Sequence, residues 1–270
     1  MGEHDIIASA MEKGHIDSLL ENNRRLDGRT KDDFRNITVK TGFVEKAEGS
    51  ALVELGKTKV IAGVKILLGK PYDDYPNKGT LIVSAELNPT ASVRYRIGPP
   101  SIQTIELARV TDRLVRESEC IDLEDLCLID GKVSFSVFID IYPIDDNGNL
   151  IDAAALAAIA ALSTAKVPEV NILEDDKVEL LESFRPLKMR KTPISITTHK
   201  LNGHLFLDPN AKEEASSDAR LTFGYTENLI NSGQKGGQGT FTKAEVLEIV
   251  EKNMEKAKEI RQIFKDKLAN

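Results

Sequence analysis

Cysteine and aromatic residues are scarce in this sequence of 270 residues, and tryptophan is absent. Its two cysteines, Cys120 and Cys127, form no C-x-x-C pair, so we expect a reduced, cytoplasmic protein with neither a disulfide scaffold nor a cysteine zinc site. An aromatic content of 5% excludes a large stacking platform for nucleic-acid bases. No apolar run is long enough to cross a membrane, and residues 1–25 lack the apolar core of a signal peptide.

The charge balance is acidic, with 36 lysines and arginines against 43 aspartates and glutamates, a net charge of −7. This excludes a generally basic, nucleic-acid-binding surface, although a local basic patch remains compatible with it. Neither a G-x-S-x-G elbow nor a metal-ligand spacing of histidines is present, so a serine hydrolase and a metallohydrolase have no support, and we expect no metal and no cofactor. The histidines are His4, His15, His199 and His204.

Periodic patterns predict an α+β fold with mixed sheets. Helices are predicted over the first 23 residues, at 101–118, at 151–165 and from Thr242 onward; the third is apolar nearly all round and therefore buried. Strands are predicted at 37–39, 50–55, 58–66, 80–87, 133–142, 193–199, 203–208, 218–226 and 228–232. The predicted division is an N-terminal helix (1–24), a first half (25–170), a charged irregular linker (171–191) and a second half (192–270).

Three arginines line one edge of the helix predicted at 101–118. Arg109, Arg113 and Arg116 are spaced by four and three residues, so their guanidinium groups can bind successive phosphates. The alternative is a solvated face on which Glu106 pairs with Arg109 and Asp112 pairs with Arg116. From the residues alone, surface ion pairs are the preferred interpretation because they are common.

Three other segments contain residues that could carry chemistry. The loop at 145–152 (DDNGNLID) enters a helix, but its three aspartates would repel phosphate, so we interpret it as an acidic helix start. An acidic cluster could bind Mg²⁺ or act in acid–base catalysis, although a turn followed by a solvated loop is preferred. The glycine-dense segment 233–240 matches no phosphate-binding motif and predicts a flexible loop. The acidic cluster consists of Asp208, Glu213, Glu214 and Asp218.

Several motifs resemble those of the RNase PH family. Residues 25–29 (RLDGR) with 34–37 (FRNI) resemble its R-x-D-G-R…R-P-I opening, with Asn36 in place of the usual proline. Residues 47–51 with 56–58 resemble its A-x-G-S…G-x-T hairpin. Further matches point to the non-catalytic RNase-PH-like ring subunits of the archaeal exosome. These are residues 70–72 with Pro76 and Gly79, residues 98–100, residues 105–110, and residues 207–209 with Glu213, Glu214 and Asp218.

This resemblance implies an RNase PH-like fold, also described as ribosomal protein S5 domain 2-like, with two similar halves. It implies a hexameric ring built as a trimer of heterodimers with a catalytic RNase-PH-like subunit. Cap subunits of the S1 and KH types and RNA are the other implied partners, without a membrane. The implied activity is 3′–5′ phosphorolytic RNA degradation by the whole complex.

The resemblance also bears on individual residues. Active members bind phosphate with a Gly-Ser-Arg-type loop, whereas residues 147–152 contain neither serine nor arginine. Asp218 aligns approximately with the acid of the active subunits, but an acid without a phosphate pocket cannot carry out phosphorolysis, so no catalytic residue is expected. The arginine helix faces the neighbour's active site in this family. RNA-backbone contact is therefore expected at Arg109 and Arg113, and then at Arg116.

Two alternatives stay open at this point. One is an autonomous phosphorolytic or metal-dependent ribonuclease that uses Asp208 and Asp218. The other is an assembly module that does not contact RNA.

Overall fold

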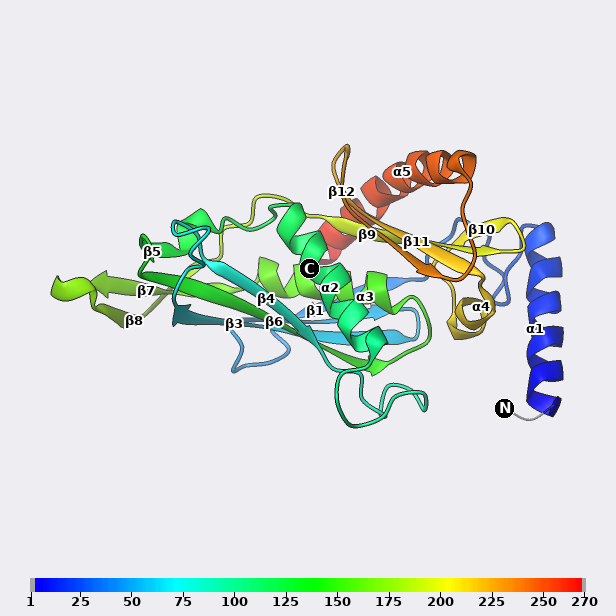
Figure 1. Ribbon diagram of the computed structural model, residues 1–270, viewed down its shortest axis with the longest axis horizontal. Coiled ribbons are helices and arrows are strands. Elements are labelled where there is room, and N and C mark those ends of the chain that lie inside the picture. The colour runs from blue at the N-terminus through cyan, green and yellow to red at the C-terminus, as the bar shows by residue number, and fades with distance from the viewer. Residues whose placement is uncertain (1–2, 269–270) are drawn as a thin grey trace.

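The computed structural model describes residues 3–268, with side chains from residue 10 onward (Figure 1). Residues 1, 2, 269 and 270, at the ends of the predicted segments 1–24 and 192–270, and the side chain of His4 lie outside the described residues. None of the helices in the described part combines the length and the apolar character that a membrane-spanning helix needs.

Helices and strands alternate irregularly along the chain, as the sequence predicts. The α-helices are α1 (Glu3–Glu21), α2 (Ile102–Glu117), α3 (Leu150–Ser163), α4 (Ala211–Ser216) and α5 (Lys243–Leu268). The strands are β1 (Ile37–Thr41), β2 (Gly49–Leu55), β3 (Thr58–Gly69), β4 (Thr80–Ala85), β5 (Cys127–Ile129), β6 (Val133–Asp145), β7 (Lys166–Ile172), β8 (Val178–Pro186), β9 (Ile194–Leu201), β10 (His204–Leu207), β11 (Ala219–Thr226) and β12 (Leu229–Gly237). Two 3-10 turns are η1 (Glu124–Leu126) and η2 (Glu174–Asp176).

The larger sheet has the strand order β1-β2-β3-β6-β4, with β5 paired to β6. Its pairs are antiparallel except for β4 and β6, which are parallel. The predicted hairpin joins β2 to β3, with Leu55 opposite Thr58. Gly56 occupies the turn at φ +58°, and an added Cβ would lie 2.5 Å from Cδ of Arg35, so this turn requires glycine.

The smaller sheet has the order β10-β9-β11-β12, and β7 and β8 form a separate two-stranded ribbon. Helix α3 packs against β2 and β3 of the larger sheet and against β9 of the smaller one. Every residue from Leu150 to Leu162 is buried, which confirms the prediction of a buried helix. Its alanines permit close backbone approach, since a Cβ added to Gly49 would lie 2.3 Å from the carbonyl oxygen of Ala161.

Helix α1 packs at one end of the molecule, and the β7–β8 ribbon extends at the other (Figure 1). Ile16 and Leu20 of α1 form a small second core with Leu201 and Phe206. The mixed α+β fold and the helices predicted at both ends of the chain are confirmed. The last helix starts with a capping box, in which Thr242 and Glu245 exchange backbone-to-side-chain hydrogen bonds.

Three predictions of local structure are wrong. Residues 178–186, predicted to belong to an irregular linker, form β8 and pair with β7. Residues 233–237, predicted as a flexible loop, end strand β12 and pair with β11. Residues 211–216, predicted as a solvated loop, form α4. The boundaries drawn at 25–170, 171–191 and 192–270 stay a prediction.

The physical reasons for these errors differ. In β8, a register irregularity opposite residues 168–170 of β7 interrupts the two-residue alternation. In β12, Gly237 takes φ +76°, and glycine weakens a strand pattern without preventing pairing. Helix α4 is short and depends on its N-terminal cap, which Asn210 and Glu213 supply.

Candidate functional site

Helix α2 has an apolar side and a charged side. Ser101 caps its start by accepting a hydrogen bond from the backbone N–H of Thr104 at 3.1 Å. Leu107, Val110 and Leu114 are buried, and the helix packs against α3, β4 and β12. The three predicted arginines therefore follow the side that is turned away from the core.

The three arginines differ in how far they are engaged. Arg109 is exposed and forms no hydrogen bond or ion pair with the described part of the chain. Arg113 donates from Nη2 to Oε1 of Gln234 at 2.5 Å. Arg116 donates from Nη2 to Oδ1 of Asp112 at 2.6 Å and is the most engaged of the three. Arg109 is thus the residue best placed to meet a ligand.

Only one of the two ion pairs expected along α2 forms. Asp112 and Arg116 pair as the helical spacing predicts. Glu106 does not pair with Arg109 but accepts from Arg220 Nη2 at 2.5 Å and from Gln234 Nε2 at 3.3 Å. Residues of the smaller sheet therefore bind the carboxylate of Glu106, which would otherwise neutralise Arg109.

The loop before α3 packs closely against the chain that follows β10. Gly148 has φ +86°, and an added Cβ would lie 2.5 Å from the carbonyl carbon of Asn210. The carbonyl oxygen of Gly148 accepts from Oγ1 of Thr58 at 2.7 Å and from Nη2 of Arg35 at 3.0 Å. A hydroxyl and a guanidinium group thus reach this loop from other parts of the chain, but both are engaged by its backbone.

Two carboxylates accept the N–H groups of the same loop. Oε2 of Glu214 accepts from the backbone N–H of Asn149 at 3.3 Å, and Oδ1 of Asp146 accepts from that of Gly148 at 3.0 Å. Asp146 also pairs with Arg94. Burial and the charge of Asp146 raise the pKa of Glu214. A phosphate here would compete with two carboxylates for these N–H groups and would meet their negative charge.

Asp152, the last aspartate of the segment 145–152, has a structural role. Asp152 is fully buried and accepts from Ser195 Oγ at 2.8 Å, from Thr197 N–H at 3.0 Å and from Thr197 Oγ1 at 2.8 Å. It therefore ties α3 to β9, a structural role that the sequence does not predict. Burial raises the pKa of Asp152 to about 6, although these hydrogen bonds favour the ionised form.

Replacing Asp152 with asparagine should change how stability depends on pH. Because the pKa of Asp152 rises from 3.8 to about 6 on folding, the folded chain binds more protons in this window, and stability falls as the pH rises through it. Asparagine does not titrate, so the stability of the variant does not fall for this reason as the pH rises. Its free energy of unfolding relative to the wild type should therefore rise by about 3 kcal/mol between pH 3.8 and pH 7, at about 1.4 kcal/mol per pH unit.

Urea denaturation of both proteins across this pH range measures that difference. His199 is also buried, and burial lowers its pKa to about 3. It titrates equally in both proteins and cancels in the comparison. A difference in unfolding free energy that stays constant with pH would contradict the assignment of the raised pKa to Asp152.

The predicted acidic cluster is not a solvated loop, because its first member is completely buried. Oδ1 of Asp208 accepts from Arg35 Nη2 at 2.7 Å and from Asn149 Nδ2 at 2.8 Å. Oδ2 accepts from Arg29 Nη1 at 3.1 Å and from the backbone N–H of Arg35 at 2.7 Å. Both carboxylate oxygens are thus occupied by groups of the chain itself, and none is left for a metal ion or a substrate.

The other members of the cluster are also engaged. Glu213 is buried in an ion pair with Arg25. Asp218 pairs with Lys13 at 2.7 Å; burial alone would raise its pKa, but the hydrogen bond from Lys13 and a backbone hydrogen bond from Asn202 lower it. Within the described residues, no three histidine, cysteine, aspartate or glutamate side chains are grouped so that they could hold a metal ion. The metal-dependent alternative therefore has no ligand set in this part of the chain.

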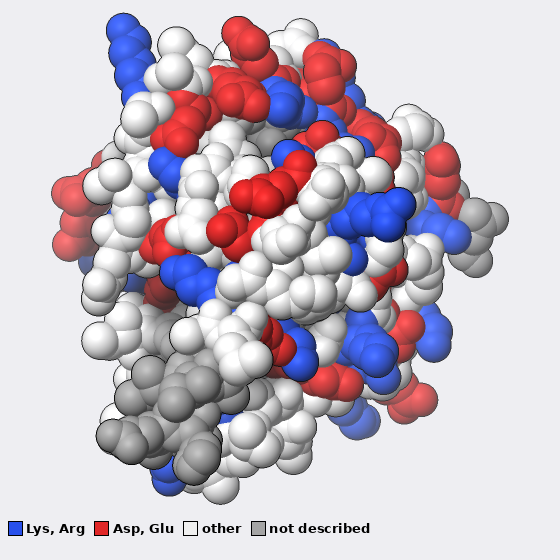
Figure 2. All heavy atoms as spheres, turned by 90° about the vertical axis from the view of Figure 1, so that its right-hand side faces the viewer, with Lys and Arg blue, Asp and Glu red and all other residues white. Residues whose placement is uncertain are grey.

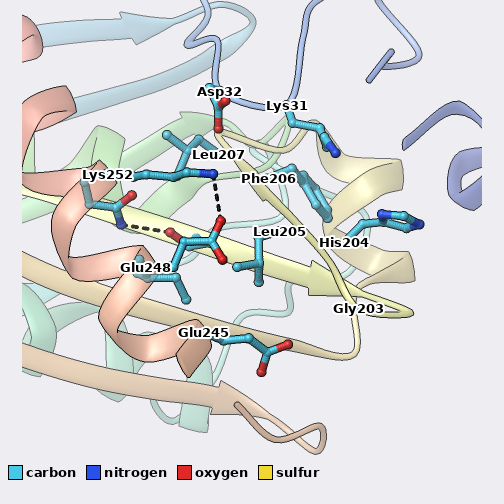
Figure 3. A pocket seen from close by; sticks show the side chains of 13 residues that line it. Lys31, Asp32, Gly203, His204, Leu205, Phe206, Leu207, Glu245, Glu248 and Lys252 are labelled. Atoms are coloured by element: carbon cyan, nitrogen blue, oxygen red, sulfur yellow. Dashed lines mark hydrogen bonds and ion pairs between the residues drawn. The ribbon is translucent and has the colours of Figure 1, made fainter. Parts of the chain in front are cut away.

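Two cavities are relevant to ligand binding. The first, of about 210 Å³, lies between α5 and β10, where Glu248 pairs with Lys252 and Asn253 donates to Thr198 (Figure 3). Four of its polar side chains thus bind one another in two pairs. The second, of about 230 Å³, lies beside the start of α3 and is lined by residues of α2 and α4 together with Arg94 and Arg220. Glu214 also lines this cavity, so a carboxylate occupies the place where an anion would approach α3.

The end of the molecule that carries α1 has a mixed surface. Figure 2 shows lysines and arginines interspersed with aspartates and glutamates on this face. The pairs Lys13–Asp218 and Lys212–Glu12 belong to it. A surface of alternating sign is not the footprint of a nucleic-acid site, so α2 remains the better candidate.

Sequence reasoning missed the long-range partners of Asp208 and of the loop before α3. Arg29 and Arg35 belong to the motif at residues 25–29 and 34–37 that resembles the RNase PH family. Their partner Asp208 lies more than 170 positions away in the chain, so no local pattern connects them. The sequence places Glu214 in an acidic cluster and gives no sign that it accepts from the backbone N–H of Asn149 in the loop before α3. A local signal existed only for α4, since Asn210 and Glu213 have the spacing of a capping box.

Comparisons with known proteins agree with this geometry. A model described as 3′ exoribonuclease family, domain 1, matches residues 33–168, and one described as domain 2 of that family matches residues 191–256. The exosome complex component Rrp42 of Thermococcus onnurineus is 43% identical over 264 residues, which is 97% of this chain and 97% of that protein. Rrp42 of Pyrococcus horikoshii is 44% identical over 265 residues, covering 97% and 96%.

Solved structures are similar over the same length. A chain of the Archaeoglobus fulgidus exosome with RNA bound to the active site is 39% identical, with a TM-score of 0.88 over 96% of this chain and 99% of that one. A chain of an archaeal exosome core is 38% identical, with a TM-score of 0.84 over 96% and 98%. The chain therefore belongs to the 3′ exoribonuclease family of RNase PH-like proteins, with both family domains in order.

Proposed function

We propose that the chain is a ring subunit of an archaeal-type exosome, a 3′–5′ phosphorolytic exoribonuclease complex, and that it is catalytically silent by itself. It completes the ring with a catalytic RNase-PH-like partner and holds RNA for that partner's active centre. Hexameric assembly as a trimer of heterodimers, capping by S1- and KH-type subunits and a cytoplasmic location belong to the same proposal. Similarity to Rrp42 exosome components over nearly the whole chain supports it.

The observation that carries the proposal is the closed anion pocket at the start of α3. Phosphorolysis needs bound orthophosphate, and the free N–H groups at a helix start are a common phosphate site. Here Glu214 and Asp146 accept the N–H groups of Asn149 and Gly148. Arg35 and Thr58 are bound to the carbonyl oxygen of Gly148. The chain thus supplies its own internal anions, and the described arginines near this loop are already engaged, Arg35 by the loop backbone, Arg94 by Asp146 and Arg220 by Glu106.

The RNA-holding role rests on α2. Arg109 is exposed and unpaired within the described residues, Arg113 keeps part of its guanidinium group free beside Gln234, and Arg116 is committed to Asp112. We therefore rank their contribution to RNA binding as Arg109, then Arg113, then Arg116. Contacts of this kind fix the position of a strand without reading its sequence.

The proposal predicts how RNA degradation depends on the partner. The purified chain, incubated with single-stranded RNA and phosphate, should release no nucleoside diphosphates. The same chain mixed with its catalytic RNase-PH-like partner should form a complex that releases them. Chromatographic detection of nucleoside diphosphates, with a reaction lacking phosphate as the control, measures this. Phosphate-dependent release by the chain alone would refute the silent assignment.

A further inference from the structure

The carboxylate of Glu106 decides how much positive charge the arginine edge of α2 presents. Glu106 lies one helical turn before Arg109, so the spacing alone would pair the two side chains. Instead, Oε2 of Glu106 accepts from Arg220 Nη2 at 2.5 Å, and Oε1 accepts from Gln234 Nε2 at 3.3 Å. Both oxygens of this carboxylate are therefore held by the smaller sheet, which packs against α2 through β12.

The position of Arg220 follows from the shape of the smaller sheet. Arg220 lies on β11, directly opposite Gly236 of β12. A Cβ added to Gly236 would lie 2.7 Å from Cζ of Arg220 and 2.8 Å from its Nε, so the guanidinium group occupies space that a larger residue would fill. The side chains of Arg220 and Glu106 are 24% and 23% exposed, and partial shielding from water strengthens their attraction.

Gln234 connects the same carboxylate to a second arginine. Its Nε2 donates to Glu106, and its Oε1 accepts from Arg113 Nη2 at 2.5 Å. A side-chain amide donates through nitrogen and accepts through oxygen, so this orientation suits an anion on one side and a cation on the other. Gln234 therefore binds Glu106 and Arg113 separately and leaves the charge of Arg113 without a carboxylate partner.

The result is an excess of positive charge at this edge of α2. Arg113 and Arg220 share one carboxylate, directly or through Gln234, while Arg109 is exposed and unpaired within the described residues. The buried Nε atoms of Arg113 and Arg220 also have no hydrogen-bond partner in that part of the chain. If Glu106 were released, it would pair with Arg109 and would bring a negative charge close to any bound phosphate.

We propose that Arg220 and Gln234 of the smaller sheet are positioning residues for RNA. By holding Glu106, they leave Arg109 and Arg113 of α2 available to the phosphates of a single strand, and neither needs to touch the RNA itself. Gly236 belongs to the same device, because its missing side chain gives Arg220 its place. This inference rests on the proposed function, since it concerns the same RNA-holding edge.

Replacing Arg220 with glutamine in the assembled complex tests this role. The loss of the guanidinium group releases one oxygen of Glu106, whose carboxylate can then pair with Arg109. Single-stranded RNA should bind about two to five times more weakly, and the slope of log affinity against log salt should fall by up to about 0.7, the value for one lost phosphate contact. Fluorescence anisotropy at several salt concentrations measures both quantities.

Adding Glu106→Gln to Arg220→Gln separates positioning from direct contact. The double variant has the net charge of the wild type and no carboxylate that could pair with Arg109, so its RNA affinity and salt slope should return to the wild-type values. If the double variant bound RNA as weakly as Arg220→Gln alone, Arg220 would act by touching RNA or by supporting the fold, and the positioning role would be wrong.

Gly236→Ala tests the same role with every charge retained, and it keeps the test decisive if Arg220→Gln unfolds. The added Cβ would displace the end of a flexible side chain and not the backbone, so the fold should tolerate it. RNA affinity should fall in the same direction, and Glu106→Gln should restore it. The matched control is Gly14→Ala on α1, where an added Cβ would meet nothing within 4 Å; it should bind RNA like the wild type.

Arg109→Ala distinguishes a failure of this inference from a failure of the proposed function. If Arg109→Ala weakens RNA binding while Arg220→Gln and Gly236→Ala both bind RNA like the wild type, this inference alone is overturned. If Arg109→Ala itself leaves RNA binding unchanged, the RNA-holding part of the proposed function is overturned instead.

Discussion

Replacing Asp208 with alanine should destabilise the chain by about 3–5 kcal/mol, which is the usual cost of removing one partner from a buried ion pair. The side chain of Asp208 is completely buried, while those of Arg35 and Arg29 are 8% and 15% exposed. Without the carboxylate, Arg35 loses the acceptor of its backbone N–H, its Nε and its Nη2. Asn149, at the start of α3, loses an acceptor as well.

Urea denaturation monitored by circular dichroism measures this loss. Asp208→Asn is the milder variant, because it keeps one acceptor oxygen, and it should lie between alanine and the wild type. Asp218→Asn is the matched control. In its ion pair with Lys13, the side chain of Asp218 is 32% exposed and that of Lys13 is 40% exposed. The substitution should therefore lower the free energy of unfolding by at most about 1 kcal/mol.

This comparison also separates a structural role from a catalytic one. If Asp208→Asn kept full stability and assembly but abolished RNA degradation by the complex, Asp208 would belong to an active centre and the structural assignment would be wrong. The same result for Asp218→Asn would revive a catalytic role for that residue. We expect complexes that contain Asp218→Asn to degrade RNA as the wild type does.

The second large effect concerns the arginines of α2. Replacing Arg109 and Arg113 together with glutamate in the assembled complex should weaken binding of single-stranded RNA more than tenfold. For a single strand, each phosphate that is no longer neutralised lowers the slope of log affinity against log salt by about 0.7, so removing both arginines should lower it by about 1.4. Fluorescence anisotropy at several salt concentrations gives both quantities.

The matched control reverses two exposed lysines of α5, Lys258 and Lys265, and changes the net charge by the same amount. It should leave the affinity and the salt slope close to those of the wild type. Arg116→Ala should have a smaller effect than Arg109→Ala, because Arg116 is held by Asp112. Unchanged RNA binding by the Arg109 and Arg113 double variant would instead favour the assembly module without RNA contact.

The parts of the fold that depend on local pattern could be predicted from the sequence. Helix α3 is apolar on all sides, and strand β6 alternates strictly over much of its length, so their burial follows from composition and spacing. The hairpin at Gly56 carries its own turn chemistry. Ribbon strand β8 could not be recognised, because its irregular pairing removes the alternation on which strand recognition rests.

The candidate site was predictable only in part, for a related reason. The spacing of Arg109, Arg113 and Arg116 fixes their common face, but it cannot reveal that Glu106 turns away to Arg220. The sequence likewise shows an acidic loop before α3, but not that Glu214 accepts its N–H group from 65 positions away. Tertiary contacts decide which charges are neutralised, and neutralisation separates a ligand-binding arginine from a structural one.

The most direct test of the central claim is the number of phosphate ions that the assembled complex binds. Titration calorimetry of the complex with inorganic phosphate should give one site for each pair of unlike subunits, because our proposal is that the chain's own carboxylates close its pocket and that the catalytic partner supplies the site. Two sites for each pair, with the second located beside Gly148 by crystallography, would contradict the account.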